Sequence, residues 1–137
     1  MDTIARGKPL LFHICPGICQ IDGNNPGFQL MLYDKKDGSF KDMATYYVAD
    51  LKSGVTGKEA WSLEYTFNDT YGFKGYDSEN LLSLAGQIAS GPAVRQKFDA
   101  LYSMKTPADQ SITEKNWKFF NCSQTHLDPA SFADCAK

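Results

Sequence analysis

Three side chains near the start of the chain have the chemistry of zinc ligands, namely His13, Cys15 and Cys19. On a β-strand His13 and Cys15 would face the same side, and zinc binds imidazole and thiolate groups well. The stretch lacks a C-x-x-C spacing, and a fourth ligand would have to come from a distant part of the chain. The simpler interpretation is a buried strand beside a Pro-Gly turn, with Cys as a small hydrophobic residue. A Cys15–Cys19 disulfide is a further alternative, if the turn brings the two Cα atoms within about 6 Å.

The sequence contains few of the residues from which catalytic sites are usually built. His13 and His126 are the only histidines, so a site with several histidine ligands or a Ser-His-Asp arrangement is hard to assemble. The H-E-x-x-H, P-loop, G-x-S-x-G and G-x-G-x-x-G motifs do not occur. His126 lies in a polar stretch, where we expect it to be solvated. We therefore predict no catalytic, cofactor-binding or metal-ligating residue in this chain.

The composition is that of one globular domain. The chain has 137 residues, 42% of them hydrophobic, with 14 Lys+Arg against 16 Asp+Glu. This near-balanced charge and the absence of a basic cluster argue against a nucleic acid or an anionic membrane as partner. No apolar run approaches the roughly 18 residues of a membrane-spanning helix. Residues 1–9 include a charge, a Gly and a Pro where a signal peptide has its apolar stretch, so we expect no signal peptide in the sequence as it stands.

The elements that would position these side chains begin with strands. Short apolar runs at 10–14 and 28–33 are bounded by Pro, Gly and Asn, which is typical of strands. Residues 34–39 predict a hairpin loop with Gly38 at positive φ, and a strand follows over 40–51. Alternate residues of that strand are predicted to share one face: Met43, Thr45, Tyr47, Ala49 and Leu51.

The pattern changes to a helical period after a linker at 52–57. Apolar residues spaced three and four apart predict a helix that Gly72 ends, with Ala60, Leu63, Phe67 and Tyr71 on one side. Asp77 or Ser78 would cap a second helix that ends before Gly91-Pro92, and a third carries Val94 to Tyr102. Ser111 or Thr113 opens a fourth helix with Trp117 and Phe120, and Asp128-Pro129 starts a last one that runs through Cys135.

These patterns predict the α+β class, with short antiparallel strands followed by a helical C-terminal subdomain. We divide the chain into strands at 1–51, a linker at 52–57 and the helical subdomain at 58–137. Aromatic residues crowd the stretch 61–76, and we interpret them as core rather than as a surface on which a ligand stacks.

An ordered series of motifs resembles the acid sphingomyelinase-like phosphodiesterases. Their final strands contain a counterpart of Cys15-Pro16-Gly17-Ile18, an N-P-G turn like Asn25-Pro26-Gly27, a strand ending in Tyr33-Asp34 and a further strand like Thr45-Tyr46-Tyr47. Later matches are Trp61 to Tyr65 with Thr70-Tyr71-Gly72-Phe73, Phe98 to Tyr102, and the cysteines Cys122 and Cys135. The resemblance runs from about Lys8 to the end of the chain.

The resemblance implies the C-terminal end of a calcineurin-like metallophosphoesterase, whose two metal ions, commonly zinc, activate water against a phosphodiester. The family's D-x-H, G-D-x-x-D, G-N-H-E/D and G-H-x-H ligand motifs lie upstream of the matching part, so we expect no metal ion in this chain. It also implies a Cys122–Cys135 disulfide. A second cysteine pair of the family is replaced by Ile112 and Asn116, and Cys15 and Cys19 stand where the family has small residues.

Two hypotheses about function follow. In the first, the chain is the structural, supporting region of a secreted phosphodiesterase and packs on the upstream catalytic domain without being active alone. In the second, it is a stand-alone interaction module whose apolar sheet edge or face is covered by a partner or by a second copy. The Met at position 1 and a length sufficient for folding motivate the second hypothesis.

Overall fold

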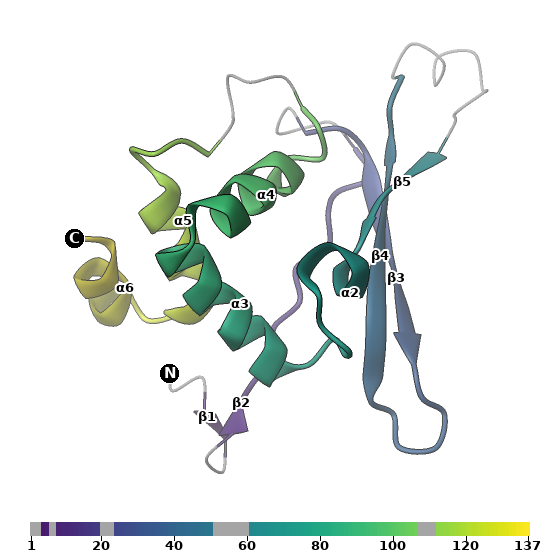
Figure 1. The fold of residues 1–137 in the computed structure, drawn as a ribbon, viewed down its shortest axis with the longest axis horizontal. Helices are drawn as coiled ribbons and strands as arrows, with labels where there is room; N and C mark the ends of the chain where they lie inside the picture. The colour runs from purple at the N-terminus through teal and green to yellow at the C-terminus, as the bar shows by residue number, and fades with distance from the viewer. Residues whose placement is uncertain (1–3, 6–7, 20–23, 51–60, 107–111) are drawn as a thin grey trace.

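The structure is a computed structural model that describes residues 4–5, 8–19, 24–50, 61–106 and 112–137 (Figure 1). The predicted linker at 52–57 lies outside the described residues, as do Leu51, Ala60 and Ser111. The proposed division of the chain into 1–51, 52–57 and 58–137 therefore remains a prediction.

A three-stranded antiparallel sheet forms one side of the molecule (Figure 1). Its strands are β3 (Gly27–Tyr33), β4 (Phe40–Val48) and β5 (Trp61–Thr66), in that order. The loop between β3 and β4 is the predicted hairpin, because the Gly38 amide donates to the Asp34 carbonyl at 2.8 Å and Gly38 has a φ of 71°. Two short strands, β1 (Ile4–Ala5) and β2 (Lys8–Pro9), pair with each other.

Helices follow the sheet and lie on one side of it (Figure 1). They are α2 (Phe67–Tyr71), α3 (Ser78–Ser90), α4 (Pro92–Tyr102), α5 (Trp117–Thr125) and α6 (Pro129–Ala136). Asp77 caps α3 by accepting from the Asn80 amide, and Asp128 caps α6 by accepting from two amides. The predicted α+β class and the second, third and last helices are confirmed.

The helix predicted across residues 60–71 is wrong in its first half. Residues 61–66 form β5, which pairs with β4, and only 67–71 are helical. Leu63 and Phe67 have a helical spacing, but residues 61–66 instead form backbone hydrogen bonds with the open edge of β4. Pairing with a distant strand therefore overrides the local pattern. Gly72 ends α2 with a φ of 77°, as predicted.

Two other element boundaries also differ from expectation. Residues 10–14 form no strand, because no described strand pairs with them. The fourth helix starts at Trp117 rather than after Thr113, since residues 113–116 form a turn in which the Asn116 side chain accepts from the Thr113 amide.

The core lies between the sheet and the helices. Phe67 and Ile88 are 2% exposed and pack with Met43, Tyr76 and Leu84. The Phe67 ring lies 5.4 Å from that of Phe73 and 5.0 Å from that of Tyr76, between ring centroids, so these aromatics form a core.

The alternation predicted for β4 holds only for its first half. Met43 and Thr45 are buried, but Val48 is buried instead of Tyr47, and Ala49 is exposed. A β-bulge lies at the same place in the sheet: Thr45 pairs with Tyr65, whereas the next residue, Tyr46, pairs with Leu63. Glu64 is therefore the extra residue of β5.

Candidate docking surface

The sheet has an apolar face that the described helices do not cover, which we call the outer face. It consists of alternate residues on β3 and β4 and one residue of β5: Phe28, Leu30, Leu32, Ala44, Tyr46 and Leu63. Leu30, Leu32 and Leu63 are 56%, 62% and 50% exposed. A shallow hollow of about 240 Å³ lies between Leu30, Leu32 and Ala44. Side chains of this kind normally face a core, so the outer face has the character of a contact surface.

The outer face is ordered by its own aromatic contacts. Phe28 stacks on Tyr46 across the β3–β4 pair with ring centroids 5.2 Å apart, and the Trp61 ring meets Phe28 edge-on at 4.8 Å. Pairing of Phe28 with Tyr46 fixes this register. The surface is therefore organised before anything packs on it.

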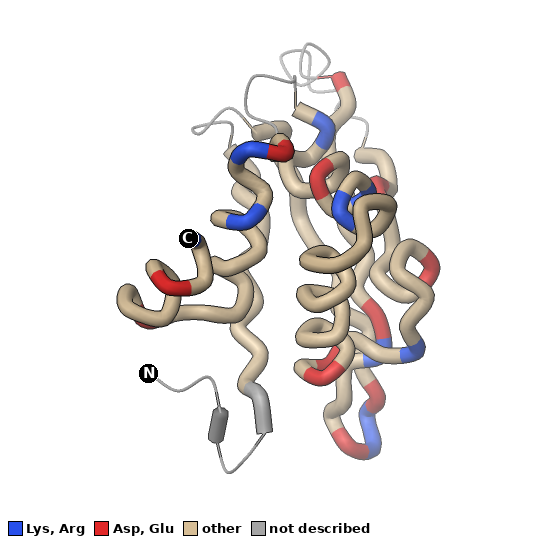
Figure 2. Tube along the Cα trace, turned by 60° about the vertical axis from the view of Figure 1, so that its left-hand side comes forward, with Lys and Arg blue, Asp and Glu red and all other residues tan. Residues whose placement is uncertain are grey.

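A second exposed apolar group, the N-terminal strip, consists of Leu10, Phe12 and Ile14. These residues alternate with Leu11, which packs on the core, and with His13, and Ile14 is 91% exposed. The stretch that follows β2 carries no Lys, Arg, Asp or Glu (Figure 2). The N-terminal strip alternates as a strand does, but it pairs with no strand among the described residues. Its backbone and its exposed side chains could therefore contact another strand.

His13 fixes the strip to the domain. Its Nε2 lies 2.7 Å from Gln29 Oε1, and its Nδ1 lies 2.7 Å from the Tyr76 hydroxyl. Gln29 Nε2 donates to Thr45 Oγ1 at 3.1 Å, so Oε1 is the acceptor and His13 Nε2 carries the proton. Burial raises the pKa of Tyr76 to about 12, and its hydroxyl donates to Nδ1.

These bonds engage both ring nitrogens of His13, and the zinc interpretation loses its histidine ligand. Cys15 and Cys19 are free and exposed, so the alternative of a disulfide between them is not realised. Across the described residues no group of three or more His, Cys, Asp or Glu side chains is placed to hold a metal ion. His126 is half-buried, and its Nδ1 lies 2.8 Å from the Thr125 hydroxyl.

The N-P-G turn joins the sheet to the turn after α4. Asn25 Nδ2 donates to the Met104 carbonyl at 2.7 Å, and the Asn25 amide donates to Thr106 Oγ1 at 3.0 Å. Met104 and Lys105 have φ values of 53° and 54°, a left-handed conformation that these bonds stabilise. A Cβ on Gly27 would lie 3.1 Å from Met104 Sδ and 3.2 Å from the Tyr46 carbonyl oxygen, so a larger residue would fit here only if these neighbours shifted.

Glu64 is a feature that the sequence did not reveal. Both of its carboxylate oxygens are buried, and neither has a hydrogen-bond partner among the described residues. Burial raises the pKa of Glu64 to about 7, and the charge of Lys105 acts in the opposite direction. The only sequence signal is that Glu64 is the one charged residue of this strand.

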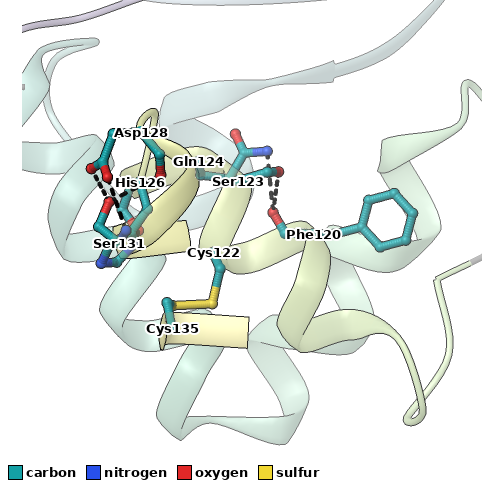
Figure 3. The surroundings of a disulfide bond; sticks show 9 residues. Phe120, Cys122, Ser123, Gln124, His126, Asp128, Ser131 and Cys135 are labelled. Carbon is teal, nitrogen blue, oxygen red and sulfur yellow. Dashed lines mark hydrogen bonds between the residues drawn. A yellow bond between two sulfur atoms is a disulfide. The ribbon is translucent and has the colours of Figure 1, made fainter. Parts of the chain in front are cut away.

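A disulfide joins the last two helices. Cys122 of α5 and Cys135 of α6 are bonded with their Cα atoms 5.8 Å apart (Figure 3). The pairing implied by the family resemblance is therefore present. Ile112, at a position of the missing cysteine pair, is instead a buried core residue, and Asn116 forms the turn before α5.

Comparisons with known proteins agree with the motif series. The family described as "Acid sphingomyelin phosphodiesterase C-terminal region" matches residues 11–137. Human "Cyclic GMP-AMP phosphodiesterase SMPDL3A" is 34% identical over 117 residues, which are 83% of this chain and 25% of that protein. Human "Acid sphingomyelinase-like phosphodiesterase 3b" is 28% identical over 123 residues, 88% of this chain and 26% of that protein. The chain spans about a quarter of the length of these relatives. Within the described residues, the helices are too short or too polar to cross a bilayer.

Proposed function

The chain belongs to the family of acid sphingomyelin phosphodiesterase C-terminal regions, and from this premise we propose that it is the structural C-terminal part of a secreted, metal-dependent phosphodiesterase. Its role is to pack on an upstream catalytic domain and complete that domain's sheet. In this proposal the two metal ions, zinc by analogy with the family, are held upstream, and this chain contributes no metal ligand or catalytic group.

The observation that carries this proposal is the uncovered apolar surface. The outer face and the N-terminal strip expose large apolar side chains on strand-like backbone. An exposed surface of this kind is unfavourable in water and is expected to be covered in the working protein. The relatives extend well beyond the matched region, so an upstream domain is available in them to cover it.

Secretion is part of the proposal because of the disulfide. A bond between Cys122 and Cys135 persists in an oxidising compartment and is reduced in a typical cytosol. The relatives differ in the substrate that their names give: SMPDL3A is named for cyclic GMP-AMP, whereas a relative from Dictyostelium discoideum is named for sphingomyelin. We infer that residues outside this region select the phosphodiester.

A chimera tests the proposal. Residues 11–137 would replace the matching region of human SMPDL3A, with the truncated relative as control, and hydrolysis of bis(p-nitrophenyl) phosphate with added zinc would be measured. We expect the truncated protein to be poorly soluble and inactive, and the chimera to recover both properties. Full activity of the truncated protein would contradict a supporting role. Chelator-sensitive hydrolysis by the 137-residue chain alone would contradict the upstream location of the metal site.

The same surface favours one other function, a stand-alone module that forms a dimer. In that case a second copy covers the outer face of the first. Light scattering on the 15.2 kDa chain distinguishes the two functions, because a dimer would have twice that mass at micromolar concentration. We expect a monomer that self-associates only weakly.

A further inference from the structure

Two motifs in the chain have the form of acceptors for N-linked glycans. They are Asn68-Asp69-Thr70 in α2 and Asn121-Cys122-Ser123 in α5. The motif N-x-S/T, in which x is not proline, is the acceptor that the secretory pathway recognises. A glycan is bulky and hydrophilic, so a folded protein carries one only where the modified side chain stays at the surface. The surroundings of the two asparagines therefore decide which motif can be occupied.

The Asn68 side chain reaches the surface and keeps one hydrogen available. It is half-buried, and its Nδ2 donates to the Lys41 carbonyl at 2.8 Å in a solvent-exposed bond. A side-chain amide nitrogen carries two hydrogens, and Nδ2 forms no second bond among the described residues. The Gly75 amide donates to Asn68 Oδ1 at 3.0 Å. A sugar can therefore replace the second hydrogen of Nδ2 while both of these bonds remain.

A glycan on Asn68 leaves the outer face free. Helix α2 lies on the helix side of the sheet, where Phe67 packs with Met43 (Figure 1). The outer face is on the opposite side of the sheet. Asp69, the middle residue of the motif, is exposed. Modification of Asn68 is thus compatible with packing of the outer face on an upstream domain.

The fold closes the second motif. Asn121 is 9% exposed, and its Oδ1 is buried without a hydrogen-bond partner among the described residues. Cys122 is 1% exposed and is bonded to Cys135 of α6. The Ser123 hydroxyl donates to the Phe120 carbonyl at 2.7 Å (Figure 3). A glycan on Asn121 would displace the residues that pack around α5, so a chain modified there cannot adopt this fold.

We propose that the secreted protein carries an N-linked glycan on Asn68 and none on Asn121. This inference rests on the secretion that is part of the proposed function, because the glycan is transferred in the secretory pathway. In the transfer Asn68 Nδ2 loses one proton and bonds to the anomeric carbon of the first sugar. The bond from that carbon to the lipid diphosphate donor breaks, and the lipid diphosphate leaves.

Secretion of the 137-residue chain from mammalian cells, behind a supplied signal peptide, tests the assignment. Peptide N-glycosidase F releases the glycan and converts the glycosylated Asn to Asp, so peptide mass spectrometry gives the occupancy of each motif. We expect a glycan on Asn68 in most of the secreted molecules and no detectable glycan on Asn121.

Variants of the two motifs identify the modified residue. Thr70→Ala removes the first motif but keeps Asn68, so it should abolish the glycan, whereas Thr70→Ser keeps the motif and should keep the glycan. Ser123→Ala should leave the mass of the glycan unchanged. As a positive control, Asp37→Asn creates an N-x-S motif with Ser39 in the exposed hairpin loop and should add a second glycan.

Two results would overturn the proposal. One is a bare Asn68 in Asp37→Asn protein that carries a glycan in the hairpin loop. The other is a glycan on Asn121 in molecules whose Cys122–Cys135 bond is intact. Neither result bears on the supporting role, because the signal peptide is supplied. Conversely, full activity of the truncated relative in the chimera experiment would contradict the supporting role and leave the occupancy of Asn68 unaffected.

Discussion

The two faces of the sheet carry similar residues but have different surroundings. The inner face packs Met43 under Phe67 and Ile88, which are almost fully buried. The outer face presents Leu30 and Leu32 more than half exposed. Residue type is thus no guide to which face the chain covers by itself. The difference shows where the fold is complete and where it requires another surface.

The largest expected contrast is between Phe67 and Leu32. Phe67→Ala should lower the free energy of unfolding by about 4 kcal/mol, because it leaves a cavity in the core. Leu32→Ala should change it by less than about 0.5 kcal/mol in the isolated chain. Urea denaturation of both variants measures the two values. Similar losses would contradict the distinction between the faces.

The cysteines give a second contrast of the same kind. Removing the Cys122–Cys135 bond by replacing both residues with Ala should cost about 3 kcal/mol, since the bond joins residues 13 apart in the sequence and so restricts the unfolded chain. Replacing the exposed Cys15 and Cys19 by Ala should have little effect. Urea denaturation compares the two double variants, and alkylation of unreduced protein should modify only the exposed pair. Modification of Cys122 and Cys135 without prior reduction would rule the bond out.

Alanine substitutions at two glycines should change the stability in opposite directions. Gly27→Ala should destabilise the chain by about 1–2 kcal/mol, because the backbone carbonyl of Tyr46 cannot move aside easily. Gly86→Ala should stabilise it by about 0.5–1 kcal/mol, since Gly86 lies in α3 with open space around it. Thermal unfolding of both variants checks the signs. A gain in stability from Gly27→Ala would contradict the tight contact of Gly27 with Met104 and the Tyr46 carbonyl.

The smallest contrast concerns two tyrosine hydroxyls. Tyr76→Phe removes the bond to His13 Nδ1 and should cost about 1 kcal/mol. Tyr33→Phe, at an exposed position of the edge strand, is the matched control and should be nearly neutral. Urea denaturation with several repeats resolves a difference of this size. Equal effects would mean that the His13 network contributes nothing to holding the N-terminal strip.

The sequence predicted the elements whose signals are local. Asp77, Gly72 and Asp128-Pro129 mark helix ends through cap chemistry that needs no distant partner, and Gly38 marks the hairpin in the same way. The disulfide came from the family resemblance. Strand β5 was mistaken for a helix because Leu63 and Phe67 fit a helical period and only pairing with β4 decides the matter.

The site itself was predicted only in outline. The expectation of an uncovered sheet surface followed from the resemblance, but the residues that form it depend on the register of β3 and β4. The bulge at Glu64 and the interaction of Asn25 with Met104 arise from contacts between distant segments, which no local pattern encodes.

Substitution of the outer face tests the docking role most directly. Leu30→Gln with Leu32→Gln should leave the stability of the isolated chain within about 0.5 kcal/mol of the wild type, since both side chains are exposed there. In the chimera with the upstream part of human SMPDL3A, the same pair should lower the yield of soluble, active protein at least about tenfold, because it places two polar groups in a contact. A chimera that tolerates both substitutions without loss would contradict the account.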